Sequence, residues 1–136
     1  MRVFIDAQCL IAANLPRDVN HLKAIALLTE FEAKNASFVT TDAVVIEFCN
    51  MLSKVALRSH AARVVRQINV RDNVDVVHVT KELLGRGLAL FESRIDKDWG
   101  LTDCTSFVIM QDFEITDALS TDGHFEQAGF NPLLRA

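Results

Sequence analysis

Residues 3–6 read Val-Phe-Ile-Asp (VFID), a short apolar run that stops at a carboxylate. Similar runs of β-favouring residues lie at Val74–Val79 and Ala118–Ser120. Two weaker candidates, Phe38–Val39 and Gly129–Phe130, complete the set. We therefore expect five short strands spread along the whole chain.

Helical spacing occupies the segments between these strands. Ala24, Leu27, Leu28 and Phe31 recur at the i, i+3, i+4, i+7 spacing of an amphipathic helix. Alternating strands and helices predict an α/β sandwich built on a parallel sheet. The two prolines are expected in connections, because proline has no backbone N–H. The further helices expected are 42–57, 59–70, 80–93 and 103–113, and the prolines are Pro16 and Pro132.

Length and composition bound the class of protein. With 136 residues, the chain is expected to form one domain, residues 1–136. Its 14 basic and 18 acidic residues give a net charge of −4, so a nucleic acid would have to bind a local basic patch. The apolar runs are shorter than the ~18 residues that span a bilayer. The charge at position 6 argues against a secretory signal. The three cysteines are widely spaced, which is typical of reduced thiols in the cytoplasm and not of a disulfide scaffold. We expect a cytoplasmic protein without a membrane segment.

Two aspartates follow strand candidates. Asp6 ends the first run, and Asp122 stands two residues after Ser120. The carboxyl ends of parallel strands form the ligand crevice of open α/β sheets, so both carboxylates are site candidates. The alternative is local, because aspartate also forms turns and helix caps at such positions.

Glu47 and Asp103 are the other two candidates. Glu47 has no oppositely charged neighbour at helical spacing, although exposed glutamates are common on helices. Asp103 opens an almost wholly apolar segment, where it is expected to act as an N-cap and as a ligand too. Two carboxylates ~4 Å apart repel by about 4 kcal/mol at an effective dielectric near 20. Four acids in one crevice would therefore take up protons or bind a hard cation, Mg²⁺ or Mn²⁺.

A basic stretch is the candidate for nucleic-acid contact. No acid occurs from Phe48 to Arg71, whereas Arg58, Arg63 and Arg66 lie there. Arg63 and Arg66 share a helix face that could meet phosphates, and an ordinary solvated face is the alternative. Outside this stretch, His124 is close enough to Asp122 in sequence to reach the same site.

Four phrases in a fixed order resemble the PIN domain, and within it the VapC-type toxin ribonucleases of type II toxin–antitoxin pairs. The resemblance covers nearly the full length. The phrases are VFIDAQCLIA at 3–12, TTDAVVIEF at 40–48, LTDCTSFVIM at 101–110 and STDGHFEQAGF at 120–130.

The resemblance implies a three-layer sandwich with a sheet of about five parallel strands. It implies a metal-dependent endoribonuclease that cuts single-stranded RNA, with Mg²⁺ or Mn²⁺ held by the four acids that fill the motif positions. It also implies a small antitoxin partner and a homodimer. Glu47 is our candidate for orienting or deprotonating the attacking water. The catalytic and metal-binding residues so implied are Asp6, Glu47, Asp103 and Asp122.

The chain departs from the family pattern at three positions. Small hydroxyl or amide residues usually follow the first aspartate, and Ala7 and Gln8 stand there instead. Gly123 stands where a basic or larger residue is frequent. The hydrogen bond that supports Asp6, and a possible phosphate contact at position 123, must then come from elsewhere if they exist.

Two other functions are compatible with the same residues. A non-catalytic module could use the acidic pocket to dock a basic, antitoxin-like peptide. A PIN-like nuclease could instead act on structured nucleic acid without being a toxin.

Overall fold

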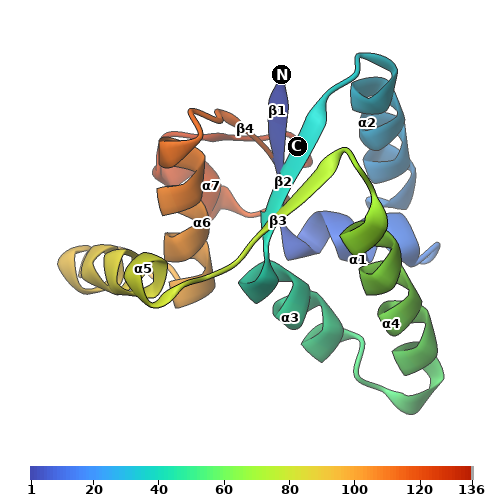
Figure 1. Ribbon diagram of the computed structural model, residues 1–136, viewed down its shortest axis with the longest axis horizontal. Helices are drawn as coiled ribbons and strands as arrows, with labels where there is room; N and C mark the ends of the chain where they lie inside the picture. The colour runs from blue at the N-terminus through green and yellow to red at the C-terminus, as the bar shows by residue number, and fades with distance from the viewer. Residues whose placement is uncertain (136) are drawn as a thin grey trace.

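A five-stranded, all-parallel sheet forms the centre of the protein, which a computed structural model describes for residues 1–135 (Figure 1). The strand order is β3-β2-β1-β4-β5. The expected α/β class and five-stranded parallel sheet are confirmed. Ala136, the last residue of the expected domain, lies outside the described residues. The strands are β1 (Arg2–Ile5), β2 (Ser37–Thr41), β3 (Val74–Val77), β4 (Asp117–Leu119) and β5 (Asn131–Pro132).

Helices cover both faces of the sheet. From β1 the chain moves one way, to β2 and β3, and then returns across the sheet to β4. Because crossovers between parallel strands are right-handed, the two directions put their helices on opposite faces. Figure 1 shows α1 to α4 on one side and α5 to α7 on the other. The helices are α1 (Ala7–Asn14), α2 (His21–Ala33), α3 (Asp42–Met51), α4 (Val55–Val70), α5 (Lys81–Ser93), α6 (Leu101–Asp112) and α7 (Gly123–Gln127).

The central strands are apolar because both of their faces are covered. Val3 lies beside Phe38 in the β1–β2 pair, and Ile5 beside Leu119 in the β1–β4 pair. All four side chains are buried. Helix α6 is enclosed as well, with every residue from Cys104 to Met110 buried. The site residues are thus carried by a rigid core.

The predicted helix 42–57 is wrong as a single element. Helix α3 ends at Met51 and α4 begins at Val55. Between them Leu52 is buried in the core, and Lys54, with a ψ of 142°, is the non-helical N-cap of α4. The chain must return to the amino-terminal edge of the sheet so that β3 can run parallel to β2, and α4 makes this return.

The strand predictions also need correction at two ends. β3 stops at Val77, because Asp42 accepts hydrogen bonds from the ring of His78 and from the backbone of Val79. The fifth strand is Asn131–Pro132 and not Gly129–Phe130, since Gly129 takes a positive φ of 93° after α7. Pro132 lies in this strand, not in a connection, and an edge strand tolerates proline.

The sequence predicts no membrane-spanning segment. Within residues 1–135, no helix combines the length and the apolar character needed to cross a bilayer.

Candidate metal centre

The carboxyl-terminal edge of the sheet holds the four predicted acids. Asp6 follows β1 directly, and Asp122 follows its neighbour β4. The connections from these two strands diverge, so the edge between them is the topological switch point where α/β sheets bind ligands. Helix α6 begins at this edge because it runs back to the start of β4, and it brings Asp103. Helix α3 leaves β2 at the same edge and brings Glu47.

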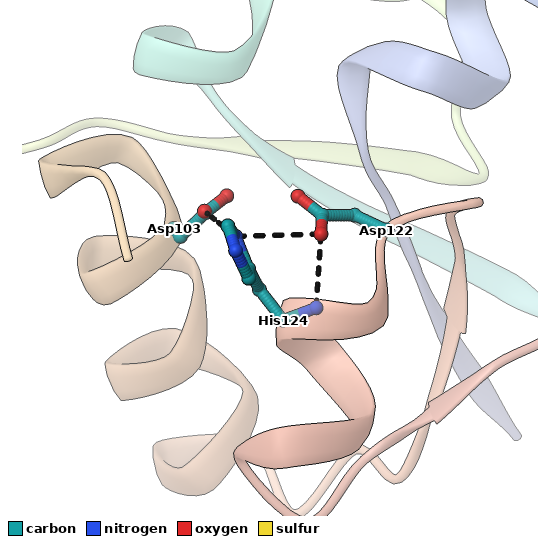
Figure 2. A group of neighbouring side chains, drawn as sticks. All are labelled: Asp103, Asp122 and His124. Atoms are coloured by element: carbon teal, nitrogen blue, oxygen red, sulfur yellow. Dashed lines mark hydrogen bonds and ion pairs between the residues drawn. The ribbon is translucent and has the colours of Figure 1, made fainter. Parts of the chain in front are cut away.

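Asp103, Asp122 and His124 form the tightest group. One ligand atom from each lies within 4.8 Å of the other two. His124 Nδ1 is 3.1 Å from Asp103 Oδ2 and 3.3 Å from Asp122 Oδ1, so the imidazole stands between the two carboxylates (Figure 2). Asp122 also caps α7, since its Oδ1 accepts a hydrogen bond of 2.9 Å from the His124 backbone N–H. Both explanations of Asp122 therefore hold, as cap and as member of the cluster.

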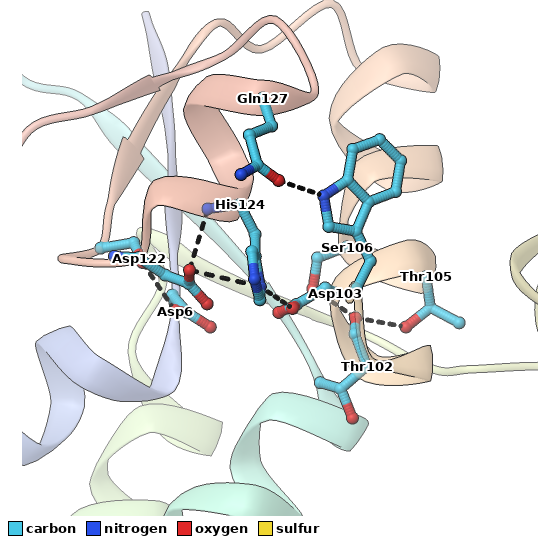
Figure 3. A network of polar contacts seen from close by, with 10 residues as sticks. Asp6, Thr102, Asp103, Thr105, Ser106, Asp122, His124 and Gln127 are labelled. Carbon is cyan, nitrogen blue, oxygen red and sulfur yellow. Dashed lines mark hydrogen bonds and ion pairs between the residues drawn. The ribbon is translucent and has the colours of Figure 1, made fainter. Parts of the chain in front are cut away.

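Asp103 is not the N-cap that the sequence predicts. Gly100 is the N-cap of α6, and Asp103 is the third residue of the helix. A negative charge in the first turn is favourable, because the free N–H groups and the helix dipole attract it. Its carboxylate faces His124 (Figure 3).

Aromatic packing holds the two helices of the cluster together. The Phe107 ring of α6 meets the Phe125 ring of α7 edge to face, with centroids 5.0 Å apart. Trp99 Nε1 donates a hydrogen bond of 3.0 Å to Gln127 Oε1 beside this pair (Figure 3). Phe107 and Phe125 are both buried, so Asp103 and His124 are presented by fixed backbones.

Asp6 is joined to the cluster by Ser120. The Ser120 hydroxyl donates a hydrogen bond of 2.7 Å to Asp6 Oδ2 and accepts one of 3.0 Å from the Asp122 backbone N–H. Asp6 occupies the N-cap position of α1 but makes no side-chain capping bond. Ser120 therefore supplies the side-chain hydrogen bond to Asp6 that the side chains of Ala7 and Gln8 do not provide.

Burial and repulsion from neighbouring acids raise the pKa values of Asp6, Glu47 and Asp103. Burial is the main cause that raises the pKa of Asp6 from 3.8 to about 7, and the charges of Asp103 and Glu47 add to it. Burial, followed by the Asp103 and Asp122 charges, raises the pKa of Glu47. Burial also raises the pKa of Asp103, and its pairing with His124 opposes the rise. Asp6, Glu47 and Asp103 thus each sense the charge of at least one other acid of this set, as groups that share a site do.

Two of the four acids belong to the tight group, and the other two lie outside it. Asp103 and Asp122 belong to the tight group, with His124 as its third member. Asp6 and Glu47 lie outside that group and interact with it through charge and through Ser120. The predicted basic residues, Arg58, Arg63 and Arg66, are exposed on α4 and do not line the cleft beside Asp122 and His124.

Ser120 was missed as a site residue by sequence reasoning. Its contact with Asp6 spans 114 residues, and no local pattern encodes it. The only signal was its place at the end of a strand candidate, one residue before the Thr121-Asp122 pair.

Comparison with known proteins gives structural matches alone. No protein-family model matches the sequence, and no curated protein sequence matches it significantly. The Mycobacterium tuberculosis toxin VapC20, which cleaves the sarcin-ricin loop, superposes with a TM-score of 0.82 at 25% identity, over 94% of this chain and 95% of that one. A chain of Rickettsia felis VapBC2, solved with a DNA fragment from its promoter, matches with a TM-score of 0.66 at 12% identity, over 97% of each chain.

The sheet order, the acidic cluster at the switch point and the structural matches together identify a PIN-domain fold. The likeness to VapC toxins that the four ordered phrases predict is confirmed by the VapC20 match over nearly the whole of both chains. The Rickettsia match supports the fold.

Proposed function

We propose that this protein is a Mg²⁺- or Mn²⁺-dependent endoribonuclease that cuts single-stranded regions of RNA and acts as the toxin of a toxin–antitoxin pair. The observation that carries the proposal is the tight group of Asp103, Asp122 and His124 at the switch point of the sheet. Asp6 and Glu47 lie close enough to this group that the charges of neighbouring acids raise their pKa values. Such an arrangement is costly without a cation. The likeness to VapC20, itself a toxin that cleaves the sarcin-ricin loop, supports RNA as the substrate.

The residues of the tight group fit a divalent ion. Asp103 and Asp122 offer hard carboxylate oxygens, which suit Mg²⁺ and Mn²⁺. The Nδ1 of His124 lies within the same 4.8 Å and would favour Mn²⁺ over Mg²⁺ as a nitrogen ligand. Asp6, whose pKa is about 7, would give up its proton when a cation is near.

Different residues of the chain would hold the ion and activate the water. A bound divalent ion would polarise the scissile phosphate and lower the pKa of a water molecule. Asp103 and Asp122 would hold the ion, and Asp6, fixed by Ser120, would complete the negative site. Glu47, half-buried and with a raised pKa, would orient the attacking water and accept its proton.

RNA binding away from the centre is assigned to α4. Arg58, Arg63 and Arg66 are all exposed there. Arg63 and Arg66 make no ion pair within residues 1–135, so both guanidinium groups can meet phosphates, whereas Arg58 donates to the Ser53 carbonyl. RNA binding by these arginines would weaken as salt rises.

Two partners belong to the proposal, a small antitoxin and a second copy of the chain, both in the cytoplasm. The antitoxin is supported by the match to VapBC2, a complex bound to its own promoter DNA. A homodimer is supported by Leu84, Leu88 and Phe91, which form an exposed apolar row at helical spacing on α5. A mass measurement in solution that gave only monomer would remove the dimer.

The direct test is an RNA cleavage assay with the purified protein. Cleavage should require Mg²⁺ or Mn²⁺, stop with EDTA, and fall by about 100-fold or more in Asp103→Asn, because an essential carboxylate is removed. The thermal unfolding of the variant should stay cooperative, which shows that the fold is intact.

The same assay separates the proposal from its alternatives. An acidic module that only docks a basic peptide would bind an antitoxin and cleave nothing. A nuclease that is not a toxin would cleave, but its expression would not arrest growth in a way that a co-expressed antitoxin relieves.

A further inference from the structure

The backbone at Arg135 is held beside the candidate metal centre by hydrogen bonds. The segment after β5 runs along β4, since the N–H of Leu133 bonds to the Ala118 carbonyl at 2.9 Å and that of Leu134 to the Ser120 carbonyl at 3.1 Å. The Leu134 side chain is buried in the core. These hydrogen bonds tie the backbone just before Arg135 to the strand that ends in the site.

Gly123 leaves room for the Arg135 side chain. Gly123 is the first residue of α7 and lies between Asp122 and His124. A Cβ atom added at this position would overlap the guanidinium group of Arg135. The Arg135 head group therefore occupies the space that a side chain at position 123 would fill.

The cleft around this head group places a guanidinium group beside residues of the acidic cluster. Its volume is ≈ 390 Å³, and its lining includes Asp122, His124 and Arg135. Arg135 is the only Arg or Lys among the described residues that line it. The carboxylates repel a phosphodiester that approaches them, and a guanidinium group at this place would offset part of that repulsion.

The guanidinium group is available to a ligand. Within residues 1–135 its ion pair is with Glu126, from Nε to Oε2 at 3.4 Å, and both side chains are at least half exposed. Exposed pairs of this kind are weak. The pair engages Nε, so the two Nη groups can still bind a phosphate with the bidentate geometry that arginine favours.

We propose that Arg135 binds an RNA phosphate next to the one that is cut, and that Gly123 is what admits its guanidinium to that place. The inference rests on the proposed function. It assigns to the C-terminal segment a substrate contact that the sequence motifs leave open at position 123.

The experiment measures binding of a fluorescently labelled single-stranded RNA over a range of salt, with Ca²⁺ in place of Mg²⁺. Arg135→Gln should weaken binding about tenfold, as expected for removal of a charged hydrogen bond. The slope of log affinity against log salt should become shallower by about 0.7, the value for one bound phosphate on a single strand. Arg135→Lys should keep the slope, because the charge stays, and recover part of the affinity.

Two variants at Gly123 test the shared space. Gly123→Ala should displace the guanidinium and weaken binding, and it should add little to Arg135→Gln in the double variant. Gly123 has no positive φ, so these changes do not strain the backbone.

Arg2→Gln is the matched control, since Arg2 begins β1 at the opposite edge of the sheet and its substitution removes the same charge. Thermal unfolding checks that every variant folds. This inference alone is overturned if Arg135→Gln binds RNA with the affinity and salt slope of the parent protein while the parent protein retains metal-dependent RNA cleavage. A parent protein that neither binds nor cleaves RNA would overturn the proposed function and this inference with it.

Discussion

At the scale of single residues, Asp6 is a carboxylate that the fold buries almost completely. Asp6 is 3% exposed, and Ser120 donates the one side-chain hydrogen bond that its carboxylate receives within residues 1–135. Burial makes the charged form of such a group costly, which raises the pKa of Asp6 to about 7. A cation at the centre would offset that cost, so Asp6 links metal binding to pH.

Asp6→Asn should stabilise the metal-free protein at high pH. The pKa of Asp6 is higher in the folded state, about 7, than its ordinary 3.8, so the folded state binds more protons between these values. The free energy of unfolding therefore falls as pH rises through that window. Asparagine removes this destabilisation, by at most about 4 kcal/mol at pH 8 and by almost nothing near pH 4.

Thermal unfolding with EDTA at several pH values measures this effect, and cleavage assays should show that the stabilised variant has no metal-dependent activity. A variant that is destabilised equally at every pH would show that Asp6 is a structural residue. One that is fully active would remove it from the site.

Sequence reasoning proposed the acids as site residues and missed some of their contacts. Asp6 and Asp122 could be predicted because each follows an apolar run, and strand ends are local features. The hydrogen bond of Ser120 to Asp6 and the placement of Arg135 over Gly123 join distant parts of the chain. They depend on packing that one sequence does not display.

At the scale of elements, the helix that bears the basic residues is not the one that bears Glu47. The break between Met51 and Val55 turns α4 away from α3. Periodicity predicted a break near residue 58, and the structure has it between Met51 and Val55. The apolar spacing continues through Leu52, whose burial belongs to tertiary packing. Arg63 and Arg66 therefore lie on a return helix, while the acids gather at the sheet edge.

Arg63→Gln with Arg66→Gln should weaken RNA binding at low salt and make the salt dependence shallower, by about 0.7 for each phosphate that the protein no longer binds. Salt titrations of RNA binding, with the same double change at Arg2 and Arg17 as control, measure it. Both control residues are exposed. An unchanged slope would remove α4 from the RNA-binding surface.

At the scale of the whole molecule, strand order decides where chemistry can occur. The order β3-β2-β1-β4-β5 makes β1 and β4 neighbours although 111 residues separate Asp6 from Asp117. Alternation of strands and helices predicted the parallel sheet, because that pattern is repeated along the chain. It could not predict which strands are neighbours, and the convergence of the acids depends on that order.

The most direct test of the central claim, that these acids converge to bind a divalent ion, is an anomalous difference map from a crystal soaked in Mn²⁺. We predict a peak within ligand distance of the carboxylates of Asp103 and Asp122, with His124 beside it. A map with ordered carboxylates and no peak between them would contradict the claim.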